Sequence, residues 1–149
     1  MMRPIYLAYR IYCFFFRPVT LGVRVMMIQN DQALLVRHTY MNGWFMPGGG
    51  VNRGETLEHA ARREAHEETG AILNDLSLVG AYTNFKKWKS DHNILFLSTD
   101  FTVSGEHDLE IVEVRFFPLD ALPADLTPGH YRRLTEYRDG KQPEAVGEW

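Results

Sequence analysis

The chain has 149 residues, a length that fits one compact domain. Its net charge of -3 gives no overall attraction to nucleic acid or to an anionic membrane, so no nucleic-acid partner is expected. An anionic small molecule must therefore be attracted by local cations or by a bound metal. The single cysteine, Cys13, excludes an intramolecular disulfide, and together with the lack of an export signal it predicts a cytoplasmic protein.

The first predicted element is a nearly continuous apolar and aromatic run at residues 5–16. The run contains Arg10 and is followed by Arg17 and Pro18, and a spanning helix needs about 20 apolar residues. We therefore expect no stable membrane span and treat residues 1–18 as a separate segment. The prediction is a short helix that packs on the domain or on the partner subunit of a homodimer. Attachment of an aromatic-rich helix to a membrane surface is the alternative.

The remaining residues, 19–149, alternate between strand and helix patterns. Runs rich in β-branched and apolar residues predict strands at residues 19–29, 33–38, 76–85, 93–103 and 111–117. Apolar spacing and terminal signals predict helices at residues 56–69 and 129–138. Asn30 and Asp31 form a turn signal between the first two strands, and Gly70 is a helix C-cap. This order predicts an α/β domain with a mixed sheet covered by helices.

Three glutamates lie on one face of the predicted helix 56–69, because Glu64, Glu67 and Glu68 are spaced i, i+3 and i+4. Like charges this close repel one another, and the C-terminal end of the helix dipole also disfavours anions. A divalent cation would reverse this repulsion, since clustered carboxylate oxygens are ligands that Mg²⁺ and Mn²⁺ prefer. The alternative is a solvated acidic face whose repulsion is reduced by neighbouring arginines.

A glycine-rich loop directly precedes this helix. The successive glycines Gly48, Gly49 and Gly50 allow the backbone to approach a ligand closely. The helix N-terminus that follows favours anions such as phosphate oxygens. Because the loop comes immediately before a helix with a carboxylate cluster, the combination favours a site for metal and phosphate over a plain acidic surface.

Loop and helix together resemble the Nudix box, GX5EX7REUXEEXGU. All the fixed positions of that pattern are matched here, by Gly49, Glu55, Arg63, Glu64, Glu67, Glu68 and Gly70. Ala65 and Ala71 occupy its two apolar positions. Residues 44–48 before the box and 116–123 after it are also similar to the family, so the resemblance extends over roughly residues 19–123.

The resemblance implies a Nudix-type α/β/α sandwich with a mixed central sheet over residues 19–149. It also implies metal-dependent hydrolysis of a pyrophosphate bond in a nucleoside diphosphate linked to another moiety. Substrates of this class are nucleoside triphosphates, ADP-ribose and nucleotide sugars. A catalytically inactive nucleotide-sensing domain is the alternative, and the complete carboxylate set favours the hydrolase.

Roles for individual residues follow from the same resemblance. The implied ligands of Mg²⁺ or Mn²⁺ are Glu64, Glu67, Glu68 and the Gly48 carbonyl. Arg63 is expected to hold a box glutamate through a charge-assisted hydrogen bond, with Glu55 behind the metal ligands. Gly49 and Gly50 are expected to lie against the substrate.

A base that accepts a proton from the attacking water is not identified by the box, because its position varies across the family. Glu110, just before the predicted strand 111–117, is the candidate. Glu106, His107 and Glu113 remain alternatives.

Substrate contacts are expected from Lys87 and Trp88, which follow the predicted strand 76–85. The lysine would attract a polyphosphate and the indole would stack on a base, an interaction worth about 1–3 kcal/mol. An exposed hairpin tip without a role in binding is the alternative for this segment. The residues after the box that are typical of the ADP-ribose and dinucleoside polyphosphate subfamilies are absent. The sequence therefore assigns no single substrate.

Overall fold

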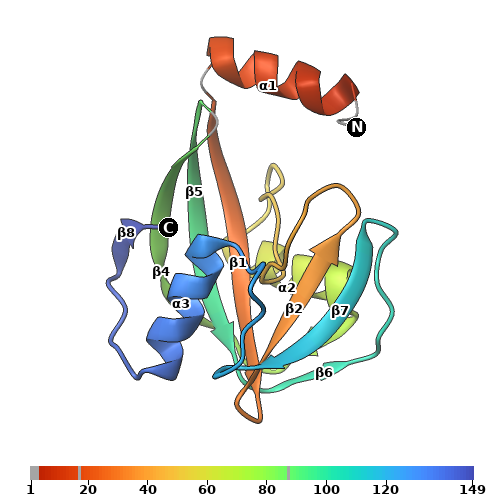
Figure 1. The fold of residues 1–149 in the computed structure, drawn as a ribbon, viewed down its shortest axis with the longest axis vertical. Helices are drawn as coiled ribbons and strands as arrows, with labels where there is room; N and C mark the ends of the chain where they lie inside the picture. The colour runs from red at the N-terminus through yellow and green to blue at the C-terminus, as the bar shows by residue number, and fades with distance from the viewer. Residues whose placement is uncertain (1–3, 17, 87) are drawn as a thin grey trace.

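The computed structural model describes residues 4–16, 18–86 and 88–149 (Figure 1). Three helices lie in these ranges: α1 (Pro4–Phe16), α2 (Leu57–Thr69) and α3 (Pro128–Arg138). The strands are β1 (Val19–Gln29), β2 (Gln32–His38), β3 (Ala71–Leu73), β4 (Ser77–Lys86), β5 (Lys89–Ser98), β6 (Phe101–Val103), β7 (Ile111–Pro118) and β8 (Val146–Glu148). Within the described ranges, no helix has the length and apolarity needed to cross a membrane.

The predicted mixed sheet is confirmed. Six strands form it in the order β7-β2-β1-β5-β4-β8. The pairs β1–β5 and β4–β8 are parallel, and the other neighbours are antiparallel. Strands β3 and β6 form a separate small sheet. Helix α2 covers one face of the large sheet and α3 covers the other, which gives an α/β/α sandwich (Figure 1).

Two apolar cores follow from the alternation of side chains along β1. Val23, Val25 and Met27 face α2, and the next residues in alternation, Met26 and Ile28, face α3. Three fully buried alanines of α2 complete the first core: Ala60, Ala61 and Ala65. Because alanine has a small side chain, α2 can approach the sheet closely.

Strands β1 and β2 diverge, and this divergence positions the glycine loop. The two strands pair beside their turn at Asn30 and Asp31, both of which have positive φ. Beyond that point the segment before α2 lies between them. Its carbonyl groups accept hydrogen bonds from both strands, as Val36 N–H donates to Phe45, Val25 N–H to Pro47 and Val23 N–H to Gly49. The hydrogen bonds thereby fix the start of the glycine loop between the two strands, ahead of α2.

The ends of α2 match the predicted helix. Thr56 is the N-cap, and its hydroxyl accepts a hydrogen bond from His59 N–H at 3.2 Å. Gly70 is the C-cap in the left-handed conformation, and its N–H donates to the His66 carbonyl at 2.8 Å. The cluster of glutamates therefore lies in the last turns of a well-capped helix.

The prediction of one strand over residues 93–103 was wrong, because the chain turns between β5 and β6. The Asp75 carboxylate causes this turn. It accepts hydrogen bonds from Thr99 N–H and Asp100 N–H, both at 2.9 Å, and from the Ser98 hydroxyl at 2.8 Å. Strands β3 and β8 were not predicted, because three residues are too few to show an alternating pattern.

Asp75→Ala is expected to lower the free energy of unfolding at pH 7 by about 2 kcal/mol, the usual contribution of hydrogen bonds to a charged group. Burial opposes ionisation of Asp75, but the hydrogen bonds from Asp100, Ser98 and Thr99 outweigh it and lower its pKa to about 2. A depressed pKa stabilises the fold above the unfolded value, so the difference from wild type should shrink as the pH falls from 3.8 towards 2. Urea denaturation across this pH range measures the difference in free energy of unfolding. The exposed Asp120→Ala is the control. Equal losses in both variants would contradict the assignment.

Helix α1 crosses the end of the sheet formed by the start of β1 and the β4–β5 hairpin (Figure 1). The predicted helix is confirmed, but its apolar side chains are largely exposed, including Leu7, Phe15 and Phe16. The Phe14 ring meets the Trp88 ring at the hairpin tip, with 5.2 Å between the centroids. Packing of α1 on a partner subunit stays a prediction.

Candidate active site

Arg63 lies at the centre of the predicted site and contacts three carboxylates. Its Nε and Nη2 donate to the two oxygens of Glu55 at 2.7 and 2.9 Å, and Nη2 also donates to the Gly50 carbonyl at 3.0 Å. Its Nη1 donates to Glu64 at 2.7 Å and to Glu67 at 3.1 Å. The hydrogen bonds from Arg63 lower the pKa of Glu55 to about 2, and Glu55 in turn raises the pKa of Arg63. One guanidinium thus connects both ends of the box.

Glu68 is the buried carboxylate of the cluster, with 9% of its surface exposed. Gly48 N–H donates to its Oε2 at 2.9 Å. Burial raises the pKa of Glu68 to about 8, although the Gly48 N–H and the charge of Arg24 act in the opposite direction. A carboxylate whose charged form is this poorly stabilised would gain from a cation beside it.

His38, at the end of β2, lies against Glu68 with its Nε2 3.7 Å from Oε1. Burial, followed by the charge of Arg24, lowers the pKa of His38 to about 4. The imidazole is therefore neutral near pH 7, and its contact with Glu68 is not an ion pair. Its buried Nδ1 has no hydrogen-bond partner among the described residues.

Two glycines of the loop lie where an added Cβ would meet other atoms. Gly48 has a φ of 150°, and a Cβ there would lie 2.1 Å from the Val23 carbonyl oxygen. A Cβ on Gly49 would lie 2.6 Å from the carboxyl atoms of Glu64. Burial raises the pKa of Glu64, against the hydrogen bond and charge of Arg63. The lack of a side chain at Gly49 therefore leaves room for the Glu64 carboxylate.

Arg24 belongs to the site and was missed by the sequence reasoning. It leaves β1 on the side opposite to Val23 and Val25, and its Nη1 donates to the Gly48 carbonyl. The carbonyl predicted to bind metal thus accepts a hydrogen bond from a guanidinium. The signal was present, since Arg24 is a charged residue between two valines of an otherwise apolar strand. His38 left no comparable signal.

Among the candidates for the base, Glu110 acts on the site most directly. It is exposed at the start of β7, and its charge contributes to the raised pKa of Glu68. Glu113 forms an ion pair with Arg115, which holds its carboxylate on the outer part of the sheet. Glu106 and His107 are both exposed in the segment before β7.

Trp88 is the predicted substrate contact after β4 that the structure describes. Lys87 is outside the described residues. Trp88 is 55% exposed and meets Phe14 of α1 rather than a residue of the glycine loop.

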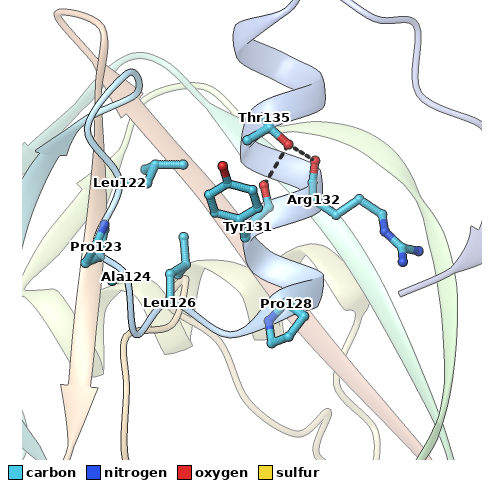
Figure 2. A pocket seen from close by; sticks show the side chains of 8 residues that line it. All are labelled: Leu122, Pro123, Ala124, Leu126, Pro128, Tyr131, Arg132 and Thr135. Carbon is cyan, nitrogen blue, oxygen red and sulfur yellow. Dashed lines mark hydrogen bonds between the residues drawn. The ribbon is translucent and has the colours of Figure 1, made fainter.

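A surface hollow of about 660 Å³ lies between α3 and the segment before it (Figure 2). Its lining is mainly apolar, and Thr135 is tied to the helix backbone by hydrogen bonds to the Tyr131 and Arg132 carbonyls. None of the predicted site residues lines it. This hollow is therefore separate from the glutamate cluster.

The donors of the cluster fit a hard divalent cation by their chemistry, because they are carboxylates and a backbone carbonyl. Within the described ranges, no three His, Cys, Asp or Glu side chains are drawn together as a metal-binding group. Glu64 and Glu67 turn instead towards Arg63, and Glu68 towards the Gly48 N–H. Burial disfavours the charged forms of Glu64 and Glu68, so both would be stabilised by a cation.

The NUDIX domain family matches residues 18–137, which is most of the chain. The chain belongs to the Nudix hydrolase family. A "Putative 8-oxo-dGTP diphosphatase" of Bacillus subtilis (strain 168) is 27% identical over 122 residues, which are 82% of this chain and 81% of that protein. An "ADP-ribose pyrophosphatase" of Methanocaldococcus jannaschii is 33% identical over 116 residues, covering 74% of this Nudix chain and 68% of that one. Other relatives, among them RNA pyrophosphohydrolases, match over less than half of their own length.

The fold of this Nudix hydrolase is also found in solved structures. A MutT NUDIX hydrolase from Burkholderia pseudomallei superposes with a TM-score of 0.72 at 22% identity, over 79% of this chain and 97% of that one. The predicted α/β/α sandwich with a mixed central sheet is therefore confirmed.

Proposed function

We propose that this Nudix hydrolase cleaves a pyrophosphate bond in a nucleoside diphosphate linked to another moiety, in a metal-dependent reaction. The observation that carries the proposal is the Arg63 guanidinium, which holds Glu55, Glu64 and Glu67 together beside the glycine loop. The names of the two relatives above describe different substrates of this class. They support the class of substrate and not one compound.

Glu64, Glu67, Glu68 and the Gly48 carbonyl would hold Mg²⁺ or Mn²⁺. When bound, such a cation neutralises pyrophosphate oxygens and lowers the pKa of the attacking water. Arg24 donates one N–H to the Gly48 carbonyl, and the other N–H groups of its guanidinium could donate to a phosphate oxygen. Arg63 would keep the carboxylates in place throughout.

Glu110 is the residue we propose as the base that accepts the proton of the attacking water. Its carboxylate is exposed, so it can exchange the proton with solvent after each turnover. The contribution of its charge to the raised pKa of Glu68 supports a position near the cluster. Gly49 and Gly50 would bring backbone groups against the substrate, because glycine has no side chain to keep a ligand away from the backbone.

Chromatographic separation of the nucleotide products formed from a panel of dNTPs, ADP-ribose, nucleotide sugars and dinucleoside polyphosphates tests this function. Activity on any accepted substrate should vanish with EDTA and return with Mg²⁺ or Mn²⁺, because the buried carboxylates lack a sufficient countercharge without a cation. The cation should also raise the melting temperature, since it binds the folded site and not the unfolded chain. Full turnover in metal-stripped protein would contradict the proposal. Nucleotide binding without cleavage of any compound would support the sensing alternative.

A further inference from the structure

The end of the molecule formed by α1 exposes an unusual amount of apolar surface. Six large side chains of this helix are between 48% and 74% exposed: Leu7, Ile11, Tyr12, Phe14, Phe15 and Phe16. The adjoining tip of the β4–β5 hairpin adds Phe85 and Trp88, which are 72% and 55% exposed. Contiguous apolar surface of this kind marks a site of contact with a protein or a membrane.

The six exposed side chains form one broad apolar face of α1. Successive residues point about 100° apart around a helix, which places all six within about 200° of its circumference. Arg10 lies outside this sector. A broad apolar face beside a basic residue suits a boundary between an apolar and a charged phase.

The charge of this segment indicates what those surroundings are. Residues 1–18 contain three arginines and neither Asp nor Glu, and the first acidic residue of the chain is Asp31. Residues 19–149 carry 13 basic and 19 acidic residues, so the rest of the chain has a net charge of -6. A symmetric dimer through α1 would bring the same positive patch against itself. An anionic surface would instead complement it.

We propose that α1 lies in the headgroup region of an anionic phospholipid membrane and attaches the protein to its surface. At 13 residues the helix is shorter than the roughly 20 that a span needs. Aromatic side chains suit the boundary between headgroups and acyl chains, and an arginine such as Arg10 can extend its guanidinium to the lipid phosphates. Figure 1 shows α1 across the end of the sheet, whereas α2 covers a face of the sheet.

Sedimentation with phosphatidylcholine vesicles, with and without phosphatidylserine, tests the proposal on the full chain. The protein should bind the anionic vesicles, and should bind them less at high salt, because screening weakens the attraction of the arginines. Phe15→Ser with Phe16→Ser should lower the vesicle affinity by about tenfold or more, since two aromatic side chains no longer enter the lipid. Arg10→Glu should lower the affinity for anionic vesicles and leave the weak binding to neutral ones unchanged.

Ile72→Ser with Leu78→Ser is the matched control. These side chains are 62% and 66% exposed and lie on β3 and β4 rather than on α1. It should bind vesicles as wild type does, and all variants should keep their melting temperatures. Equal affinity of wild type and the Phe15/Phe16 variant for anionic vesicles would overturn the proposal. So would a stable dimer in solution that the Phe15/Phe16 variant loses, which would show that a second copy covers α1.

Discussion

Glu68→Gln is expected to lower kcat by about 10²–10⁴ while changing KM much less. Glutamine keeps the size of the side chain and can still accept the hydrogen bond that Gly48 N–H donates at 2.9 Å. It removes the buried negative charge that would bind the cation, a loss of about 3–5 kcal/mol in transition-state stabilisation. Steady-state kinetics, measured beside the metal-induced rise in melting temperature, should show both quantities falling together.

Glu110→Gln is the matched comparison, because it removes a carboxylate near the same cluster without removing a proposed metal ligand. It should give a similar loss of kcat and keep the metal-induced rise in melting temperature, since accepting a proton and binding metal are separate duties. Near-wild-type kcat in Glu110→Gln would remove it as the base and leave His107, Glu106 and Glu113. Near-wild-type kcat in Glu68→Gln would contradict the metal site itself.

Elements governed by local signals were predicted well from the sequence. The bounds of β1 agree with the predicted strand, and α2 ends at the predicted C-cap, Gly70. The break between β5 and β6 could not be predicted in this way, because Asp75 comes more than twenty residues before the turn it holds. The short strand β8 pairs with β4 from the far end of the chain, and its three residues carry no pattern of their own.

The residues of the candidate site also differ in how far the sequence predicted them. Spacing along one helix was enough to place the glutamates on a common face, and the resemblance to the box implied that Arg63 holds a box glutamate. Arg24 and His38 come from two strands that diverge around the glycine loop, so their meeting with Glu68 depends on tertiary structure. Spacing in the sequence does not report such a meeting.

Gly49→Ala is expected to lower kcat by about 10²-fold with little change in the melting temperature of the metal-free protein. The new Cβ would lie 2.6 Å from the carboxyl carbon and both carboxyl oxygens of Glu64. Those atoms are the far end of a flexible side chain, so the carboxylate moves and the backbone stays in place. Glu64 would then lose its 2.7 Å hydrogen bond from Arg63 and its place as a metal ligand. A displacement of about 1 Å in a reacting group can cost that factor in rate.

Gly50→Ala is the control for this effect, because a Cβ on Gly50 meets no atom within 4 Å. It keeps the Gly50 carbonyl that accepts a hydrogen bond from Arg63, so Glu64 stays in place and the metal-induced rise in melting temperature should equal that of wild type. Gly49→Ala should lose most of that rise. If the two variants lose the metal-induced rise equally, the effect comes from the loop backbone and not from the space beside Glu64. If Gly49→Ala retains both kcat and the rise, Glu64 does not bind the metal from the position the structure gives it.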